Sequence, residues 1–356
     1  MLISRRLLSG LALAAFVAGG TSVAQAQEKT DFKVAWSIYV GWMPWGYASD
    51  TGIVKKWAEK YGITIEVTQF NDYVESMNQY TAGAFDAVTL TNMDGLSIPA
   101  AGGVDTTAVI VGDFSNGNDA VILKDKATLA DLKGQPVNLV EYSVSHYLLA
   151  RALESAGMSE KDVNVVNTSD PDMVGAFQTP DVTAMVTWNP MVAEILKLPD
   201  AHKVFDSTQI PGEIIDMMVA NTAVLKDNPN FGKALAGIWY DTMAAMTATT
   251  PEGAAARTAM GVASGTDLAG FEAQLAATKL FDKPADAVAF TASPDLEKTM
   301  DLVRTFLFDK GLLGSGAASA DVIGIELPDG KVLGDSANVK LRFSDTYMKA
   351  AADGSL

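Results

Sequence analysis

The sequence predicts an α/β protein of two lobes, each built around a doubly wound sheet, with a hinged cleft between them. Strand and helix patterns alternate from residue 32 to about residue 205, which is typical of parallel α/β units. A stretch rich in Gly, Asn and Ser at 113–118 divides this alternation into two units. Helical patterns dominate after residue 221, as expected if the chain returns to the lobe in which it began.

The first unit reads as strand, helix, strand, helix, strand. Ile63, Ile65 and Val67 alternate with polar residues, as in a strand with one buried face. Asp72 and Glu75 form a capping-box pattern at the start of the second helix. Strand patterns cover 32–38, 63–67 and 85–90, and helical patterns cover 50–61 and the stretch from 72 to Gly83.

The second unit repeats this order before the helical region. Its strand patterns cover 136–140, 163–167, 182–188 and 203–205. Long helices are expected at 231–246 and 296–310, with one later strand at 323–327. The patterns divide the mature chain into a first lobe of 27–112 and 222–356 and a second lobe of 113–221, with crossings near 113–118 and 212–221. Ligands of open α/β sheets bind beyond the carboxyl ends of the strands, so we expect the site in the loops that follow them.

The first 26 residues have the order of a secretory signal. Arg5 and Arg6 precede an apolar run at 7–20, and Ala24-Gln25-Ala26 offers the small-x-small pattern that signal peptidase cuts. The apolar run is too short for a permanent membrane helix. We therefore expect a periplasmic protein, cleaved near Ala26, and the paired arginines leave the Sec and twin-arginine export routes both open.

Composition narrows the classes of function. The chain has no Cys, which excludes disulfides, thiolate metal sites and a lipid-modified N-terminal Cys. Its formal net charge of −17 makes nucleic acid and anionic lipid surfaces poor partners. The two histidines, His146 and His202, are too few to suggest a transition-metal centre, and the sequence has no nucleotide-binding or Ser-nucleophile motif. We expect a monomeric binding protein that uses no cofactor and is not an enzyme.

The loop after the first strand holds a cluster of aromatic residues. Three of the six tryptophans and two tyrosines lie at 36–47, interrupted by two Gly and one Pro, which argues against a regular helix there. Such rings can stack on a planar ligand or hold a cation against their faces, and they can equally cap the lobe core. We expect both uses, with Tyr39 and Trp42 facing the ligand because they lie nearest the end of the strand.

Two later loops each offer a carboxylate. Asp94 lies where a strand ends and a helix begins, so it either caps that helix or faces the cleft. Glu141 ends another strand and either points into the cleft or lies on a solvated rim. Further candidates for the ligand shell are Thr91, Asn92, Ser143, Trp188 and, in the second expected crossing, Asp216.

Several segments resemble the nitrate/sulfonate/taurine-type substrate-binding proteins of ABC transporters. They are Gly52-Ile53, Lys55-Lys56-Trp57-Ala58, Tyr80 to Ala87, Leu132-Lys133-Gly134, Ser145 to Leu149 and Trp188-Asn189-Pro190. Together they cover most of residues 32–225, while the C-terminal third is only loosely similar. The resemblance implies a two-lobed periplasmic-binding-protein fold of type II and, as partners, a cognate ABC permease with its ATPase.

Two positions depart from the sulfonate-binding pattern of this family. Sulfonate and taurine binders tend to carry small residues in the loop that holds Asp94, and a Lys-Gly-Ser-like turn in the loop that holds Glu141. Carboxylates would repel a sulfonate, whereas they would pair with a flat guanidinium, which also suits aromatic rings. The arrangement resembles the branch of the family associated with urea carboxylase and guanidine carboxylase gene clusters. We therefore expect a small planar nitrogen-rich ligand, guanidinium first and urea second. Asp94 and Glu141 would accept hydrogen bonds from its N–H groups.

Two alternatives remain at this stage. A taurine, sulfonate or other small-solute binder would keep the fold and change the chemistry of the cleft. The family also resembles the pyrimidine-precursor synthases of thiamine synthesis, enzymes that rely on a histidine and bound pyridoxal phosphate. The predicted export signal argues against that enzyme, because those synthases work in the cytosol.

Overall fold

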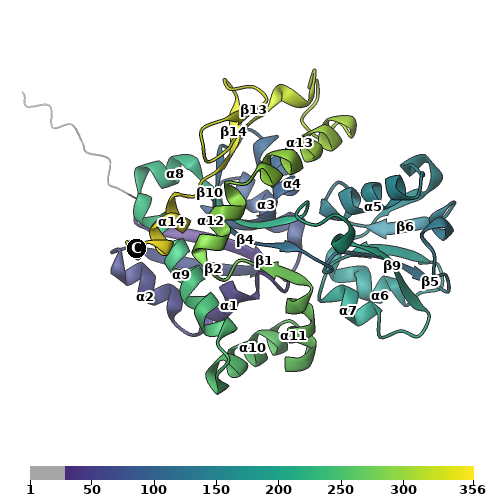
Figure 1. The fold of residues 1–356 in the computed structure, drawn as a ribbon, viewed down its shortest axis with the longest axis horizontal. Coiled ribbons are helices and arrows are strands. Elements are labelled where there is room, and N and C mark those ends of the chain that lie inside the picture. The colour runs from purple at the N-terminus through teal and green to yellow at the C-terminus, as the bar shows by residue number, and fades with distance from the viewer. Residues whose placement is uncertain (1–28) are drawn as a thin grey trace, which may run out of the picture.

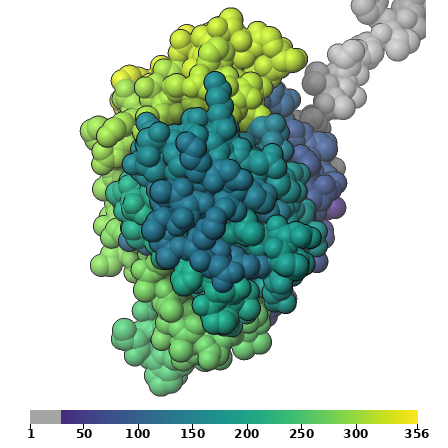
Figure 2. All heavy atoms as spheres, turned by 90° about the vertical axis from the view of Figure 1, so that its right-hand side faces the viewer, coloured from purple at the N-terminus to yellow at the C-terminus, as the bar shows by residue number. Residues whose placement is uncertain are grey.

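Two β-sheets, each covered by helices, divide the molecule into a large and a small lobe (Figure 1). The structure is a computed structural model that describes residues 29–356, so the predicted signal at 1–26 lies outside the described residues. In Figure 2 the small lobe, in blue and teal, faces the viewer, with C-terminal segments of the large lobe in green and yellow around it. Within residues 29–356, no helix is long and apolar enough to cross a membrane.

The large lobe is built on a nine-stranded sheet in the order β13-β12-β14-β4-β10-β3-β1-β2, with β11 paired to β4. Its strands are β1 (Asp31–Ser37), β2 (Thr64–Phe70), β3 (Ala87–Thr91), β4 (Thr106–Ser115), β10 (Ile215–Asn221), β11 (Thr278–Leu280), β12 (Gly324–Glu326), β13 (Val332–Leu333) and β14 (Val339–Phe343). β1 lies parallel to both β2 and β3, as the alternation of strands and helices predicts. β10 runs antiparallel to both its neighbours, β3 and β4.

Eleven α-helices cover this sheet among the described residues. They are α1 (Met43–Asp50), α2 (Ile53–Lys60), α3 (Tyr73–Thr81), α4 (Asn92–Gly95), α8 (Thr222–Asp227), α9 (Pro229–Thr247), α10 (Pro251–Ala263), α11 (Leu268–Ala276), α12 (Pro284–Thr291), α13 (Pro294–Asp309) and α14 (Thr346–Ala352). The predicted cap of α3 is present, because the Asp72 side chain accepts a hydrogen bond from the Glu75 backbone N–H at 2.9 Å. The long helices expected at 231–246 and 296–310 are α9 and α13.

The small lobe has a five-stranded sheet in the order β7-β6-β8-β5-β9. Its strands are β5 (Ala120–Lys124), β6 (Pro136–Leu139), β7 (Asn164–Asn167), β8 (Ala184–Thr187) and β9 (Ala201–Asp206), and its helices are α5 (Val144–Ser155), α6 (Met173–Phe177) and α7 (Met191–Ile195). β6 pairs in parallel with β7 and β8, whereas β5 runs antiparallel to β8 and β9.

The aromatic segment at 36–47 is more regular than its sequence suggests. The expectation of an irregular loop is wrong in its second half, since α1 begins at Met43. Pro44 lies in the first turn, where a backbone N–H needs no partner within the helix. Gly46 lets the Trp36 ring pack against the helix, because a Cβ at this position would lie 2.7 Å from the Trp36 ring.

Two neighbouring strands place both crossings between the lobes. β4 continues to Ser115 in the large sheet, and β10 begins there at Ile215, so the return crossing precedes residue 215 instead of extending to 221. The crossing segments touch, since the Ser115 and Ser207 hydroxyls are 2.7 Å apart. β10 lies between β3 and β4 and is buried on both faces, so its sequence shows no alternating pattern. For this reason the segment was predicted to be a crossing and not a strand of the first lobe.

Candidate ligand-binding site

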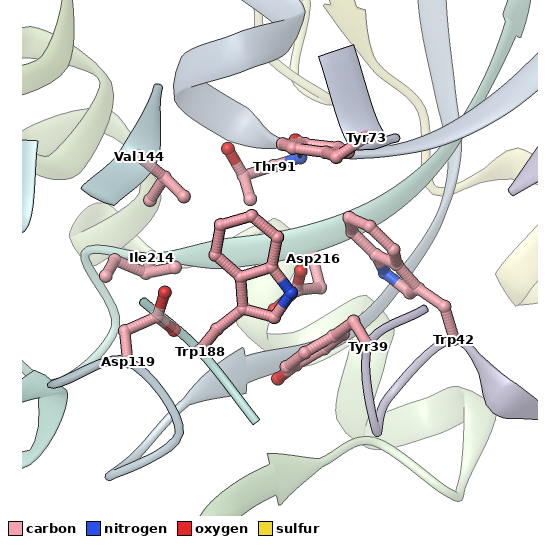
Figure 3. A pocket seen from close by; sticks show the side chains of 9 residues that line it. All are labelled: Tyr39, Trp42, Tyr73, Thr91, Asp119, Val144, Trp188, Ile214 and Asp216. Carbon is pink, nitrogen blue, oxygen red and sulfur yellow. Dashed lines mark hydrogen bonds between the residues drawn. The ribbon is translucent and has the colours of Figure 1, made fainter. Parts of the chain in front are cut away.

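A small pocket lies where the two lobes meet, with an empty volume of about 270 Å³ (Figure 3). The large lobe and its return segment contribute six of its lining residues and the small lobe three. These nine residues are Tyr39, Trp42, Tyr73, Thr91, Ile214 and Asp216, together with Asp119, Val144 and Trp188. The pocket is small, so it suits a ligand of few atoms.

Four aromatic side chains form a continuous wall around the pocket. Trp42 lies between two tyrosines, with ring centroids 5.2 Å from Tyr39 and 5.4 Å from Tyr73. Trp188 from the small lobe meets Tyr73 edge to face at 5.8 Å, and Figure 3 shows its indole between Tyr39 and Tyr73. The Trp188 indole also donates a hydrogen bond to the Ile38 carbonyl at 3.2 Å, which joins the lobes beside the pocket. The wall presents ring faces and edges from both lobes.

A pair of buried aspartates lies on the two central strands of the large sheet. Asp216 on β10 is opposite Asp113 on β4, and both side chains are buried. The Tyr39 hydroxyl donates to Asp113 Oδ1 at 3.0 Å, while within residues 29–356 Asp113 Oδ2 and Asp216 Oδ2 have no hydrogen-bond partner. Burial raises the pKa of Asp113 to about 7. Burial and then the Asp113 charge raise the pKa of Asp216 well above its ordinary value.

A third carboxylate reaches the pocket from the small lobe. Asp119 directly precedes β5 and is 3% exposed. Burial raises the pKa of its carboxyl to about 7. None of the ion pairs formed within the described residues includes Asp119, Asp113, Asp216 or Asp94. The pocket is thus bordered by buried acids that the described chain does not neutralise.

A second cavity of about 190 Å³ adjoins the pocket and shares Trp42 and Asp216 with it. Its lining also includes Thr89, Asp113 and Trp239. Each of these five residues carries a buried side-chain N or O atom that has no hydrogen-bond partner in the described part of the chain. The residues of this cavity thus carry two indole N–H donors and three oxygens whose hydrogen-bonding capacity the described chain leaves unused.

Asp94 lies behind the pocket wall and is fully buried. Its Oδ2 accepts hydrogen bonds from the Tyr73 hydroxyl at 2.8 Å, the Thr91 hydroxyl at 2.9 Å and, across the cleft, the Val144 backbone N–H at 3.4 Å. Burial raises the pKa of the Asp94 carboxyl to about 6, against the lowering effect of these bonds. Asp94 thereby holds three residues that line the pocket without lining it itself.

Comparison with known protein families identifies the family of this chain. A model of the NMT1-like family matches residues 26–263. The chain belongs to this family. Among curated relatives of this NMT1-like protein is the taurine-binding periplasmic protein of Escherichia coli, 25% identical over 183 residues, which are 50% of this chain and 56% of the relative. The chain thus spans little more than half the length of the curated relatives that it matches.

Solved structures support the fold of this NMT1-like protein. The alkanesulfonate-binding protein of Xanthomonas axonopodis pv. citri bound to MOPS superposes with a TM-score of 0.65 at 15% identity, covering 82% of this chain and 96% of that chain. The periplasmic aliphatic sulphonate binding protein of Escherichia coli gives a TM-score of 0.63 at 19% identity, covering 80% of this chain and 93% of that one. The expected two-lobed, type II periplasmic-binding-protein fold is confirmed.

The structure brings five of the nine expected site residues together in the pocket of this NMT1-like protein. They are Tyr39, Trp42, Thr91, Trp188 and Asp216. The other four, which include Asp94 described above, lie outside the lining. Asn92 instead joins α4 to the return segment, since its side chain donates to the Glu213 carbonyl at 3.1 Å and accepts from the Ile215 N–H at 3.1 Å. Ser143 caps α5, where its hydroxyl accepts from the Ser145 N–H.

Glu141 lies away from the pocket, at the rim of the small lobe. Its backbone N–H donates to the Asn167 side chain at 2.9 Å, and its side chain raises the pKa of the exposed Tyr142 through a hydrogen bond and through its charge. The expectation that Glu141 reaches into the cleft therefore differs from its position in the structure. Tyr142 has a positive φ of 66°, and the backbone turns there before α5 begins.

Four residues that line the pocket were not predicted from the sequence. Tyr73 follows the cap Asp72, and its position at a helix start gave no sign that it faces the other lobe. Asp119 had a usable signal, because it is an acid directly before an apolar strand and beside an expected crossing. Val144 and Ile214 are apolar residues that gave none. Among the described residues no group of three or more His, Cys, Asp or Glu side chains could hold a metal ion.

Proposed function

We propose that this NMT1-like protein is the periplasmic substrate-binding protein of an ABC importer and that its interlobe pocket binds a small planar nitrogen-rich cation. Guanidinium is the first candidate and neutral urea the second. The observation that supports a cation is the set of buried aspartates at the pocket, which form no ion pair within residues 29–356. We propose further that it acts as a monomer, delivers its ligand to a cognate permease with its ATPase, and does no catalysis.

The electrostatic argument rests on the cost of burying charge. A carboxylate removed from water without a partner is destabilised by several kcal/mol, and it responds by binding a proton or a cation. The raised pKa values of Asp119 and Asp113 express that cost. A guanidinium that entered the pocket would restore the missing positive charge and form charge-assisted hydrogen bonds with the carboxylates.

The shape of the pocket favours a flat cation among possible cations. Tyr39, Trp42, Tyr73 and Trp188 enclose it with aromatic rings, whose faces attract positive charge. Asp119 and Asp216 line it from opposite lobes, so a ligand with N–H groups on several sides can bond both. We assign these two carboxylates as the acceptors of ligand N–H groups, with Thr91 as a further polar contact. Such a ligand would draw the lobes together because each contributes an acceptor.

Two other functions fit the pocket less well. Relatives and neighbours are described as binding taurine or sulfonates, but a sulfonate would meet Asp119 and Asp216 and be repelled by both. An enzyme of the thiamine-pyrimidine-synthase type would use a histidine and bound pyridoxal phosphate. Among the described residues that line the pocket there is no His or Lys, and the buried acids would also repel a phosphate.

Calorimetric titration of the purified protein with guanidinium chloride, urea and taurine tests the proposal. We expect tight binding of guanidinium, weaker binding of urea and none of taurine. Tight binding of taurine would contradict a cation site. Absorbance in the region of pyridoxal phosphate, measured on the same preparation, would instead point to the enzyme.

A further inference from the structure

Two helices start at the interface between the lobes, and each receives a carboxylate from the opposite lobe. The Val144 N–H, at the first residue of α5 in the small lobe, donates to Asp94 Oδ2 of the large lobe at 3.4 Å. The Tyr73 N–H, at the first residue of α3 in the large lobe, donates to Asp170 Oδ1 of the small lobe at 3.3 Å. Each lobe thus contributes one carboxylate to the N-terminus of a helix in the other lobe.

The start of α5 has the properties of an anion site. α5 has 12 residues, so the backbone N–H groups of its first turn lie at the positive end of the helix dipole. Ser143 caps it by accepting from the Ser145 N–H, which leaves the Val144 N–H directed at Asp94. Ser145 Oγ in the same turn is buried and, within residues 29–356, has no hydrogen-bond partner.

Asp94 fills that site from the other side of the cleft. The side chain is fully buried, and its Oδ2 is fixed by the Tyr73 and Thr91 hydroxyls as well as by Val144. Its Oδ1 has no hydrogen-bond partner in the described part of the chain. Tyr73, Thr91 and Val144 all line the pocket, so the carboxylate lies directly behind the wall that a ligand would touch.

We propose that Asp94 is a tethered substitute for an anionic ligand: its carboxylate occupies the N-terminus of α5, holds the lobes together and bars free oxyanions from the pocket. This role rests on the proposed function. In a cleft that closes on a cation, Asp94 accepts the hydrogen bond of the Val144 N–H at the N-terminus of α5, which no cationic ligand could accept. A free oxyanion would have to displace Asp94 from the Val144 N–H and then lie beside its negative charge.

Removal of the tethered carboxylate should therefore create an anion site. Asp94→Ala leaves the Val144 N–H without its acceptor, whereas Asp94→Asn keeps an oxygen of the same reach and loses only the charge. Methanesulfonate and sulfate are the probes, since both are small and carry no cationic group. Asp119 and Asp216 still oppose an anion in this variant, but the Val144 N–H can then donate a charge-assisted hydrogen bond to the sulfonate. We therefore expect Asp94→Ala to bind methanesulfonate at least about tenfold more tightly than the wild type does. Asp94→Asn should gain little.

Asp170→Ala is the matched control. It also removes a buried carboxylate that crosses the cleft, but Asp170 is bonded to the start of α3 and not of α5. An equal gain of methanesulfonate binding in Asp170→Ala would overturn the proposal, since any loss of negative charge would then suffice. No gain in folded Asp94→Ala, checked by near-UV circular dichroism, would overturn it as well.

Two further arms keep the test decisive. If Asp94→Ala does not fold, Asp94→Ser supplies a small polar side chain. Because sulfate stabilises proteins in general, the comparison is with the wild type: a larger rise of the melting temperature in sulfate for Asp94→Ser than for the wild type supports the proposal, and an equal rise in both proteins contradicts it. Guanidinium titration of the wild type tests the proposed function separately. A wild type that ignores guanidinium, beside an Asp94→Ala that gains methanesulfonate, would refute the ligand class and leave the role of Asp94 standing.

Discussion

Acidic residues lie between the lobes in two places, and they are treated in opposite ways. At the outer edge, Glu213 accepts hydrogen bonds from Arg151 Nε at 2.9 Å and from the Tyr147 hydroxyl at 2.6 Å. Glu160 there forms an ion pair with Lys310 and lies 3.3 Å from His146 Nε2. In and around the pocket, the aspartates meet tyrosine and serine hydroxyls, a backbone N–H group and one another, with no Lys or Arg partner among the described residues. Asp119 and Asp216 line the pocket, while Asp113 and Asp94 lie beside it.

The difference shows in how readily each acid ionises. Burial acts to raise the pKa of Glu160, but the neighbouring His146 ring and Lys310 ammonium bring it below its ordinary value. Burial raises the pKa of Asp119 in the pocket and of Asp113 in the adjoining cavity to about 7, because hydrogen bonds to neutral groups such as the Ser115 and Tyr39 side chains offset it only in part. The outer edge therefore carries its own cations, whereas the pocket acids have no cationic partner among the described residues, and the proposed ligand would supply one. The net charge of the chain could not reveal this difference, because the acids of the outer edge and those of the pocket differ only in whether a cation lies beside them.

The largest effect should come from an acid of the pocket. We expect Asp216→Asn to weaken guanidinium binding by about 100-fold, since removing one partner of a buried charge pair costs about 2–5 kcal/mol. The ligand-free variant should melt at a higher temperature than the wild type, because the desolvated carboxylate is gone. Titration calorimetry and thermal melting measure the two. Glu141→Gln, an acid at the rim, is the control and should leave both values unchanged; equal losses in the two variants would contradict the comparison.

The second prediction concerns pH. Asp113 and Asp119 have pKa values of about 7 in the folded protein, above the ordinary 3.8 of an aspartate. Their raised values favour the protonated folded state, so the stability of the ligand-free protein should fall as pH rises from about 4 to about 7. Guanidinium binds the ionised carboxylates, so its affinity should rise by about tenfold or more over the upper part of that range.

Urea provides the control for this pH series. It is neutral, so its affinity should not increase as the carboxylates ionise. Melting curves of the ligand-free protein and titrations of both ligands across the same pH values decide the matter. A guanidinium affinity that stays flat with pH would mean that Asp119, one of the two assigned acceptors, does not hold the cation.

The third prediction addresses the aromatic wall. Trp188→Ala should weaken guanidinium binding by about tenfold, because a desolvated cation held against a ring gains about 1–2 kcal/mol. Trp188→Phe keeps a ring face and loses the indole N–H that bonds the Ile38 carbonyl, so it should lose only about threefold. Calorimetry with both variants separates the ring from the interlobe hydrogen bond. Equal losses would assign the effect to the hydrogen bond alone.

The smallest effect should come from the outer edge. Lys310→Met removes the cation that pairs with Glu160, and partly exposed ion pairs contribute only about 0.2–1 kcal/mol. We expect a loss of ligand affinity of about threefold or less, which should shrink further in high salt. Titrations at low and high ionic strength measure it. A loss as large as that of Asp216→Asn would erase the distinction between the two sets of acids.

The sequence was informative about the fold where patterns were local. Period-two alternation and the Asp72 cap placed β2 and α3, and long apolar periodicity placed α9 and α13. It failed at the centre of the large sheet. β4 and β10 are buried on both faces and so lack alternation, and an aspartate in each interrupts the apolar run.

The sequence predicted which kinds of side chain form the candidate site better than it predicted which of them face the pocket. The acid and aromatic character of the loops pointed to Tyr39, Trp42 and Asp216, which line the pocket. Which way a strand-end side chain points depends on the lobe opposite, and no local pattern encodes that lobe. Asp94 illustrates this, because its choice between capping its own helix and facing the cleft was resolved by a backbone N–H 50 residues away.

The double crossing also bears on the order in which the protein folds. The small sheet uses only residues 120–206, whereas the large sheet joins strands that begin at residue 31 and end at residue 343. Contacts between residues close in sequence form sooner, since closing a shorter loop costs less entropy. We expect the small lobe to gain hydrogen-exchange protection first during refolding, with the large lobe waiting for its last strand. Simultaneous protection of β5 and β4 in pulse labelling would show instead that the two lobes fold as one unit.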